Sequence, residues 1–236
     1  MNFRLAAAGA GRPCWPVTSL AWPWMELRID VQLPRLDIER DLRRRHERLQ
    51  EREDLIDVQP LLKAPLPGLV FRYRETDGEF HIYVEDTVRQ RLAGYTIFGR
   101  VGELDREAAR WVRAPHSRYS PDYQRRGIAS AVYRWALNAG LCLVSGPRQS
   151  EAAHALWRSL SRDYACAYVA LTGQRLHCLG ESVDEARQTQ LDTRLALFGP
   201  HWNAERFARL ISPAPEGQGA LRQTMAAFAQ RLRRWA

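Results

Sequence analysis

The chain has 236 residues, of which 45% are hydrophobic and 26% charged, and this is an ordinary composition for one globular domain with appendages. Its formal net charge is +8, but Lys63 is the single lysine among 35 basic residues. That bias is more typical of a GC-rich genome than of a phosphate-binding surface. The four cysteines lack paired Cys-x-x-Cys spacing, which argues against a structural zinc site and fits a reducing cytoplasm.

The first 24 residues mix alanine, glycine, proline and tryptophan without periodicity. We expect residues 1–24 to be a poorly ordered N-terminal extension, and whether Met25 is the true start stays open. The apolar residues alternate in Glu26–Leu33, which predicts the first strand of a domain over residues 25–180. No stretch approaches the length of a membrane span, so we expect no membrane partner.

A highly charged segment from Asp37, the expected N-cap, to Asp54 predicts an amphipathic helix. Seven arginines and seven acidic residues lie between Arg35 and Asp54. Because opposite charges at helical spacing pair with one another, the segment favours a solvated helix over an RNA-binding arm.

Three strands are predicted next, over Leu69–Glu75, Glu79–Asp86 and Arg91–Val101. Asp77-Gly78 between the first two is a strong hairpin signal. Trp111–Tyr119 can form the following strand. It contains Pro115, which cannot donate to a ladder and therefore requires a bulge or a splay.

A glycine-bearing basic turn, Ser120–Ser130, follows this strand and opens an apolar-striped helix. Several backbone N–H groups then converge at a helix N-terminus, and this arrangement suits a pyrophosphate. Gly127 lets the backbone approach a ligand, Ala129 keeps the helix start open, and Arg125 and Arg126 add positive charge.

The order Pro121-x-Tyr123-Gln124-x-x-Gly127-x-Ala129 resembles the acyl-CoA signature of the GNAT N-acetyltransferase superfamily. Gly140 as a helix stop, the apolar strand Leu141–Val144 and a second helix after Ser150 extend the resemblance. It covers roughly residues 68–180 and ends in a hairpin of Cys166–Leu171 with Arg175–Leu179. The resemblance implies an α/β (α+β) fold, with a mixed, mostly antiparallel twisted sheet that is splayed at the cofactor site and flanked by helices.

The resemblance also implies acetyl-CoA, or another acyl-CoA, as co-substrate, no metal, and acetyl transfer to a primary amine by direct attack. Trp157 stands where many members carry a tyrosine that protonates the leaving thiolate, and indole has no dissociable proton near neutrality. We expect His116 to act as the base and Tyr164, or Tyr119, as a weaker candidate acid. Carboxylates at Glu85, Asp86, Glu103 and Asp105 are the alternatives for the base. The expected cofactor-binding residues are Tyr119, Gln124, Arg125, Arg126, Gly127, Ile128, Ala129, Ser130, Ser150 and Trp157.

After Gly180 we expect a helical appendage over residues 181–236 that packs on the domain. Its predicted segments are Val183–Phe198, Trp202–Ile211 and Gly219–Ala236, separated by glycine and proline.

Two alternatives to an amine acetyltransferase stay open: a toxin-like member that acylates aminoacyl-tRNA, and a regulatory protein that binds acyl-CoA without turnover. The leading hypothesis takes a small-molecule or peptide amine as partner. A tRNA partner is the minority hypothesis. The expected location is cytoplasmic, and the oligomeric state is left open, with a dimer as one arrangement.

Overall fold

The computed structural model describes residues 34–51, 56–57, 66–102, 104–173 and 175–212. The predicted extension 1–24, the strand Glu26–Leu33, the candidate Glu103 and the helix Gly219–Ala236 lie outside these residues. None of the described helices is long and apolar enough to cross a membrane.

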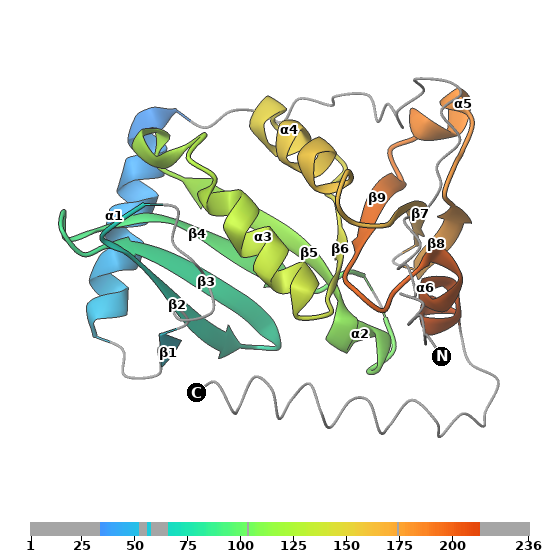
Figure 1. Ribbon diagram of the computed structural model, residues 1–236, viewed down its shortest axis with the longest axis horizontal. Helices are drawn as coiled ribbons and strands as arrows, with labels where there is room; N and C mark the ends of the chain where they lie inside the picture. The colour runs from blue at the N-terminus through green and yellow to red at the C-terminus, as the bar shows by residue number, and fades with distance from the viewer. Residues whose placement is uncertain (1–33, 52–55, 58–65, 103, 174, 213–236) are drawn as a thin grey trace, which may run out of the picture.

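One mixed sheet organises the described residues, with the strand order β1-β2-β3-β4-β5-β6-β9-β7-β8 (Figure 1). All neighbouring strands are antiparallel except β5 and β6, which are parallel. The strands are β1 Ile56–Asp57, β2 Leu69–Thr76, β3 Glu79–Asp86, β4 Arg91–Gly99, β5 Val112–Tyr119, β6 Cys142–Val144, β7 Cys166–Thr172, β8 Arg175–Gly180 and β9 Thr193–Phe198. The predicted mixed, mostly antiparallel fold class is confirmed.

The helices are short apart from the first, and several come directly after a strand. They are α1 Arg35–Gln50, α2 Ala108–Trp111, the 3-10 turn η1 Pro121–Tyr123, α3 Ile128–Asn138, α4 Glu151–Leu160, α5 Glu185–Gln188 and α6 Ala204–Ile211. The helix predicted over Trp202–Ile211 is therefore confirmed as α6.

The predicted hairpin between β2 and β3 is confirmed. Asp77 and Gly78 have φ angles of 52° and 72°, the left-handed conformation that a tight two-residue hairpin turn requires at both central positions.

Helices cover both faces of the sheet. Leu42 and Leu49 of α1 pack against Tyr83, Leu92 and Tyr95. Neighbouring residues of a strand point to opposite faces, and α3 and α4 pack on the other face, with a cluster that contains Ile82, Phe98, Val132, Trp157 and Leu160. In the view of Figure 1, α3 crosses in front of the sheet near β5.

Helix α1 begins earlier than the sequence predicts. Its N-cap is Pro34, and no side chain caps it, so the predicted N-cap Asp37 is wrong. The backbone oxygen of Pro34 instead accepts hydrogen bonds from the N–H groups of Asp37 and Ile38, at 3.0 and 3.2 Å, and these bonds begin the helix.

The sheet splays between its two parallel strands. β5 pairs with β6 only at Val112 and Arg113, whereas its pairing with β4 continues from Ala114 to Tyr119 without a register shift. Pro115 lies just beyond Arg113, the last residue of β5 that pairs with β6. Of the two predicted outcomes at this proline, a bulge or a splay, the structure shows the splay. An unpaired strand edge therefore runs from Ala114 toward the β5–α3 turn.

The helix predicted over Val183–Phe198 is wrong for most of its length. Only Glu185–Gln188 is helical, and Thr193–Phe198 forms β9, which lies between β6 and β7. All six residues of β9 are buried. A strand buried on both faces loses the alternation that marks a strand in sequence, and a short apolar run then resembles a helix segment. The predicted β7–β8 hairpin is confirmed, but β9 is the strand that joins it to β6.

Candidate functional site

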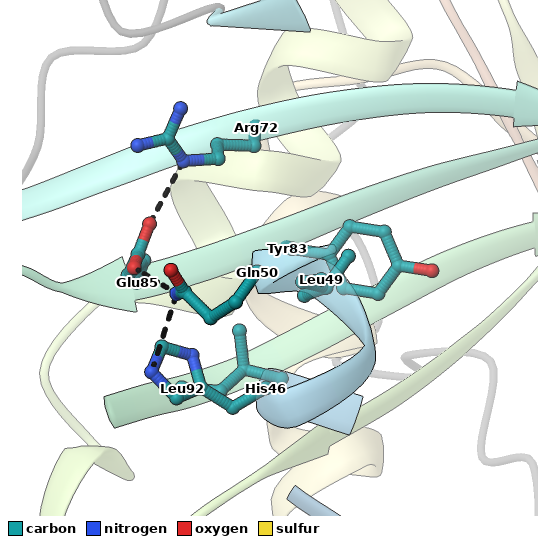
Figure 2. Close-up of a pocket in the computed structure, with 7 residues that line it drawn as sticks. All are labelled: His46, Leu49, Gln50, Arg72, Tyr83, Glu85 and Leu92. Atoms are coloured by element: carbon teal, nitrogen blue, oxygen red, sulfur yellow. Dashed lines mark hydrogen bonds and ion pairs between the residues drawn. The ribbon is translucent and has the colours of Figure 1, made fainter. Parts of the chain in front are cut away.

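A cavity of about 200 Å³ opens between the C-terminal end of α1 and strands β2, β3 and β4 (Figure 2). Its polar wall is already paired: Glu85 accepts hydrogen bonds from Arg72 Nε at 2.8 Å and from Gln50 Nε2 at 3.2 Å. The cavity contains none of the predicted site residues except Glu85. The Glu85 carboxylate forms an ion pair with Arg72, so its role is to hold β2 and β3 together and not to act as a base.

The β5–α3 turn is the exposed feature with ligand-binding geometry. Gln124, Arg125, Arg126 and Gly127 are all exposed, whereas Ile128 is buried as the first core residue of α3. Arg125 and Gly127 have φ angles of 58° and 76°. These two left-handed residues bend the chain sharply, so that backbone N–H groups can converge on one point.

Gly127 is the N-cap of α3, and no side chain caps this helix end. The first N–H groups of a helix have no intrahelical acceptor, and the helix dipole adds partial positive charge there. Arg125 and Arg126 make no ion pair or hydrogen bond with any residue in the described ranges. The turn therefore presents uncapped donors and two unpaired cations, which suits an anionic group.

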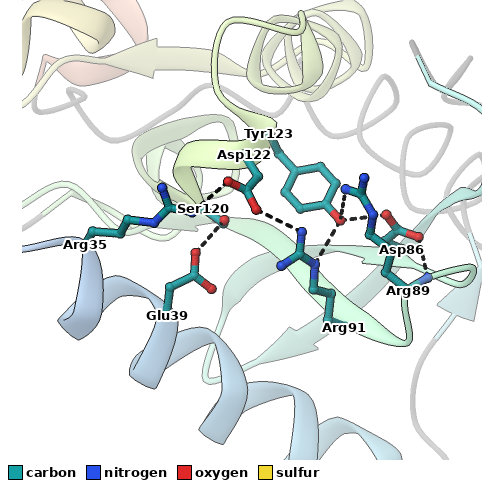
Figure 3. A network of polar contacts seen from close by, with 8 residues as sticks. All are labelled: Arg35, Glu39, Asp86, Arg89, Arg91, Ser120, Asp122 and Tyr123. Atoms are coloured by element: carbon teal, nitrogen blue, oxygen red, sulfur yellow. Dashed lines mark hydrogen bonds and ion pairs between the residues drawn. The ribbon is translucent and has the colours of Figure 1, made fainter.

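The start of the turn is held by a polar network (Figure 3). Tyr123 donates a 2.6 Å hydrogen bond to Asp86 Oδ2 and accepts one from Arg91 Nε at 3.1 Å. Asp122 accepts from Arg91 and from Arg35 of α1, at 3.0 and 2.8 Å. These contacts join the turn to α1, β3 and β4, and they fix the direction in which the chain enters Gln124.

Asp86, one of the alternative bases, has a structural role in this network. Burial tends to raise the pKa of its carboxyl, but the hydrogen bond from Tyr123 and the backbone N–H groups of Arg89 and Val88 outweigh burial and lower it. A carboxylate so well supplied with donors is a weak base. Asp105 is also occupied, because it accepts from the backbone N–H groups of Glu107 and Ala108 at the start of α2.

Gln124 is tied back to the strand that precedes it. Its Nε2 donates to the backbone oxygen of Tyr119 at 2.9 Å. The side chain thus shapes the turn, which leaves the backbone from Gly127 to Ser130 as the part that can face a ligand.

The second predicted cofactor element, α4, begins at Ser150, whose hydroxyl caps the helix by accepting from Ala153 N at 3.2 Å. Trp157 on this helix is 4% exposed. Its ring meets Tyr133 of α3 edge-on, with the ring centroids 6.1 Å apart. Trp157 therefore packs α4 against α3 as an apolar wedge.

Four hydroxyl groups form a connected network under α3 that the sequence did not predict. Thr96 Oγ1 lies 2.8 Å from Ser117 Oγ and 2.9 Å from Tyr119 Oη, and Ser117 Oγ donates to Tyr133 Oη at 3.2 Å. Burial raises the pKa of Tyr119 and raises that of Tyr133 to about 12. Ser117 and Tyr119 are two residues apart on β5 and therefore share one face of the sheet. This spacing is the one sequence signal that could have suggested the network.

The predicted catalytic residues do not meet. His116 is exposed on β5, opposite Ile97, with its ring 6.4 Å from that of Tyr95, on the α1 face of the sheet. Tyr119 is buried on the α3 face. Tyr164 donates to Asn138 Oδ1 at 2.9 Å, at the C-terminal end of α3. An 11-residue helix is about 15 Å long, so Tyr164 lies roughly a helix length from the turn.

No cluster of three or more potential metal ligands occurs in the described part of the chain. No protein-family model matches the sequence, and no curated protein matches it.

Several solved structures are similar to this chain. One is a phosphinothricin acetyltransferase of the GNAT superfamily from Sinorhizobium meliloti in complex with AcCoA, 18% identical, with a TM-score of 0.32 over 61% of this chain and 69% of that chain. Another is a chimera of the spermidine N-acetyltransferase SpeG from Vibrio cholerae and hSSAT, 14% identical, with a TM-score of 0.30 over 56% of this chain and 70% of that one. A third is a cAMP-binding acyltransferase from Mycobacterium smegmatis, 14% identical, with a TM-score of 0.38. That match covers 87% of this chain but only 63% of the other protein's length.

Proposed function

We propose that this protein is an acyl-CoA-dependent N-acyltransferase of the GNAT type, which transfers an acetyl group from acetyl-CoA to a primary amine. One observation carries the proposal. The uncapped turn at Gly127 and the unpaired edge of β5 from Ala114 onward belong to the same strand–turn–helix unit.

Each part of acyl-CoA has a counterpart in this unit. The pyrophosphate would bind the N–H groups of Gly127 to Ser130 beside Arg125 and Arg126. The amide-containing arm would lie along the free edge of β5, where main-chain groups can bind it as a neighbouring strand would. This edge spans six residues, or about 20 Å. The thioester would then lie in the splay between β5 and β6.

The proposed reaction is a direct attack. The amine nitrogen forms a bond to the thioester carbonyl carbon, the C–S bond breaks with the electron pair on sulfur, and a base removes a proton from the nitrogen. We propose His116 as that base, because it lies on β5 beyond the last β6 partner and is exposed on the α1 face of the sheet. Tyr164 is the weaker proposal for an acid, because its hydroxyl is bound to Asn138 far from the turn.

A protein that binds acyl-CoA without turnover is a second candidate. The buried Trp157, which offers no titratable proton where relatives carry a tyrosine, favours it. The tRNA alternative finds less support, because Arg40 and Arg45 of α1 pair with Asp37 and Asp41 on the same helix.

Calorimetry with acetyl-CoA, followed by mass spectrometry of a panel of amines incubated with the protein and acetyl-CoA, tests these proposals. Binding with acetylation of one amine class supports the transferase. Binding without any product supports the second candidate, and absence of binding contradicts both. Aminoacyl-tRNA, tested at low and high salt, serves as a separate acceptor, because binding to a phosphate backbone weakens as salt rises.

A further inference from the structure

Two arginines on the α1 face of the sheet share one carboxylate. Asp41 of α1 accepts a hydrogen bond from Arg118 Nη1 of β5 at 2.8 Å and one from Arg45 Nε at 3.3 Å. It also accepts from Tyr95 Oη of β4 at 3.0 Å. Burial tends to raise the pKa of the Asp41 carboxyl, but the hydrogen bond from Tyr95 and the charges of the two arginines outweigh burial and lower it. Asp41 is therefore ionised, and its one negative charge faces two positive charges.

Both guanidinium groups keep unused donors. Arg45 bonds to Asp41 through Nε and Arg118 through Nη1, and the described residues offer no acceptor to the Nη groups of Arg45 or to Nη2 of Arg118. The side chains of Arg45 and Arg118 are 32% and 24% exposed, so a solute can reach them. The guanidinium of Arg45 lies over the ring of Tyr95, with Cζ 4.2 Å from the ring centroid, and this contact restricts its orientation.

This cationic pair lies beside the proposed base. Arg118 and His116 are two residues apart on β5, so their side chains leave the same face of the sheet about 7 Å apart along the strand. The Tyr95 ring that carries Arg45 is 6.4 Å from the ring of His116. An amine that reaches His116 on this face therefore brings its neighbouring groups close to Arg45 and Arg118.

The other charged groups on this part of the face do not cancel the surplus. Strand pairing aligns Arg74 with His81, and Glu79 Oε2 lies 3.6 Å from His81 Nε2. Burial is the main reason that the pKa of His81 is lowered; Glu79 opposes the shift, and the positive charges of Arg74 and Arg45 add to it. Arg74 and Glu79 offset one another, which leaves the excess positive charge at Arg45 and Arg118.

We infer that the acceptor is a free amino acid, a small amine that carries a carboxylate. The inference rests on the proposed acyl transfer and names the substrate class of that site. The carboxylate binds the unused N–H groups of Arg45 and Arg118, because the planar guanidinium matches the two oxygens of a carboxylate. The amino group then points toward His116. An acceptor with a second positive charge, such as a diamine, is repelled by the same pair.

Matched acceptors test the inference on the full chain. Glycine, β-alanine and 4-aminobutyrate are each compared with the corresponding amide, and 1,3-diaminopropane is added as a dication. Release of CoA from acetyl-CoA gives kcat and KM for each acceptor. Since a hydrogen bond to a charged group is worth more than one to a neutral group, we expect the best amino acid to exceed its amide at least about 10-fold in kcat/KM.

Arg45→Gln should remove this preference without loss of the fold, because Asp41 keeps Arg118 and Tyr95 as donors. We expect the KM of the amino acid to rise about 10-fold, with the KM of the amide and the Kd of acetyl-CoA within about threefold. A purely structural role of Arg45 would change the KM of both acceptors equally. Arg40→Gln is the control, because Arg40 is an exposed arginine of the same helix that pairs with Asp37, and it should change none of these quantities.

Asp41→Asn gives a second test with the opposite sign. It removes the charge that competes for both guanidinium groups while an oxygen remains for Tyr95, so the KM of the amino acid should fall. Equal kcat/KM for amino acid and amide, a preference for the dication, or an equal effect of Arg45→Gln on both acceptors would overturn the inference and leave the transferase standing. Acetyl-CoA that binds but releases no CoA with any amine contradicts acyl transfer itself, and this inference with it.

Discussion

The ring of Tyr119 lies against the bare backbone of Gly94. A Cβ at position 94 would be 2.2 Å from Tyr119 Cδ1 and 2.7 Å from the backbone oxygen of Arg118. Real Cβ atoms essentially never make contacts under 3.0 Å, so a side chain at position 94 would force the Tyr119 ring or the backbone to shift. Because Tyr119 Oη reaches Thr96 from that position, Gly94 also determines where the hydroxyl network can form.

Gly94→Ala should therefore destabilise the protein by about 1–3 kcal/mol, the usual cost of overpacking. Urea unfolding measures this free energy. Gly99→Ala on the same strand is the control, because the nearest atom to its Cβ would be the flexible carboxylate of Glu79, at 3.1 Å, and the backbone oxygen of Ala114 would be at an ordinary contact distance of 3.6 Å. If both variants lost the same stability, the packing of Tyr119 on Gly94 would not be the cause.

Gly127→Val should abolish acetyl-CoA binding while the domain stays folded. A β-branched residue is strained at a φ of 76°, and its side chain would project from an exposed turn whose backbone must approach the pyrophosphate. Calorimetry measures the affinity, and circular dichroism checks the fold.

Gly173→Val is the matched control for this substitution. Gly173 has a φ of 55°, with nothing within 4 Å of its Cβ, in the β7–β8 turn. The control should carry similar backbone strain but bind acetyl-CoA normally. Unchanged affinity in Gly127→Val would exclude the β5–α3 turn as the pyrophosphate site.

His116→Gln should lower turnover about 10²-fold, leave acetyl-CoA affinity intact and remove the acidic limb of the pH–rate profile. His177→Gln, an exposed histidine on β8, should change none of these quantities. If the acidic limb persisted in His116→Gln, the base would be another group, or the amine would arrive already neutral.

The Tyr123–Asp86 contact should make the folded state sensitive to acid. The pKa of Asp86 is lowered in the folded protein, so its stabilising effect is fully present above the unfolded value near 3.9 and is lost as pH falls through the folded value below it. Asp86→Asn should lower the free energy of unfolding at pH 6 by about 1–3 kcal/mol. The difference from the unaltered protein should shrink below about pH 4.

The control for this pH series is Asp163→Asn, which removes a solvent-exposed ion pair with Arg134. Exposed pairs of this kind contribute little to stability, so we expect a small change across the series. A constant difference between Asp86→Asn and the unaltered protein from pH 6 to pH 2 would contradict the role given to the Asp86 carboxylate.

Features set by local chemistry were predictable from the sequence. The Asp77-Gly78 hairpin, the strand over Glu79–Asp86 and the glycine turn at Gly127 each depend on a few neighbouring residues whose conformational preferences are known. Pro115 likewise predicted a bulge or a splay, because a proline has no N–H to donate to a ladder, and the strand pairing shows a splay.

Features set by strand register and burial were not predictable. Thr193–Phe198 resembles a helix because both of its faces are buried. Thr96, Ser117 and Tyr133 are separated in sequence and meet only through the β4–β5 register and the docking of α3. Tyr164 follows α4 in the chain, yet it lies at the far end of α3 from the turn. The spacing of residues along the sequence does not give this distance in space.

A crystal structure with bound acetyl-CoA would test the central claim most directly. The account predicts the pyrophosphate on the backbone N–H groups of Gly127 to Ser130, the amide arm along the edge of β5 from Ala114 to Tyr119, and the thioester in the splay between β5 and β6. Density for acetyl-CoA elsewhere, such as in the cavity beside Glu85, or no density at saturating concentration, would contradict it.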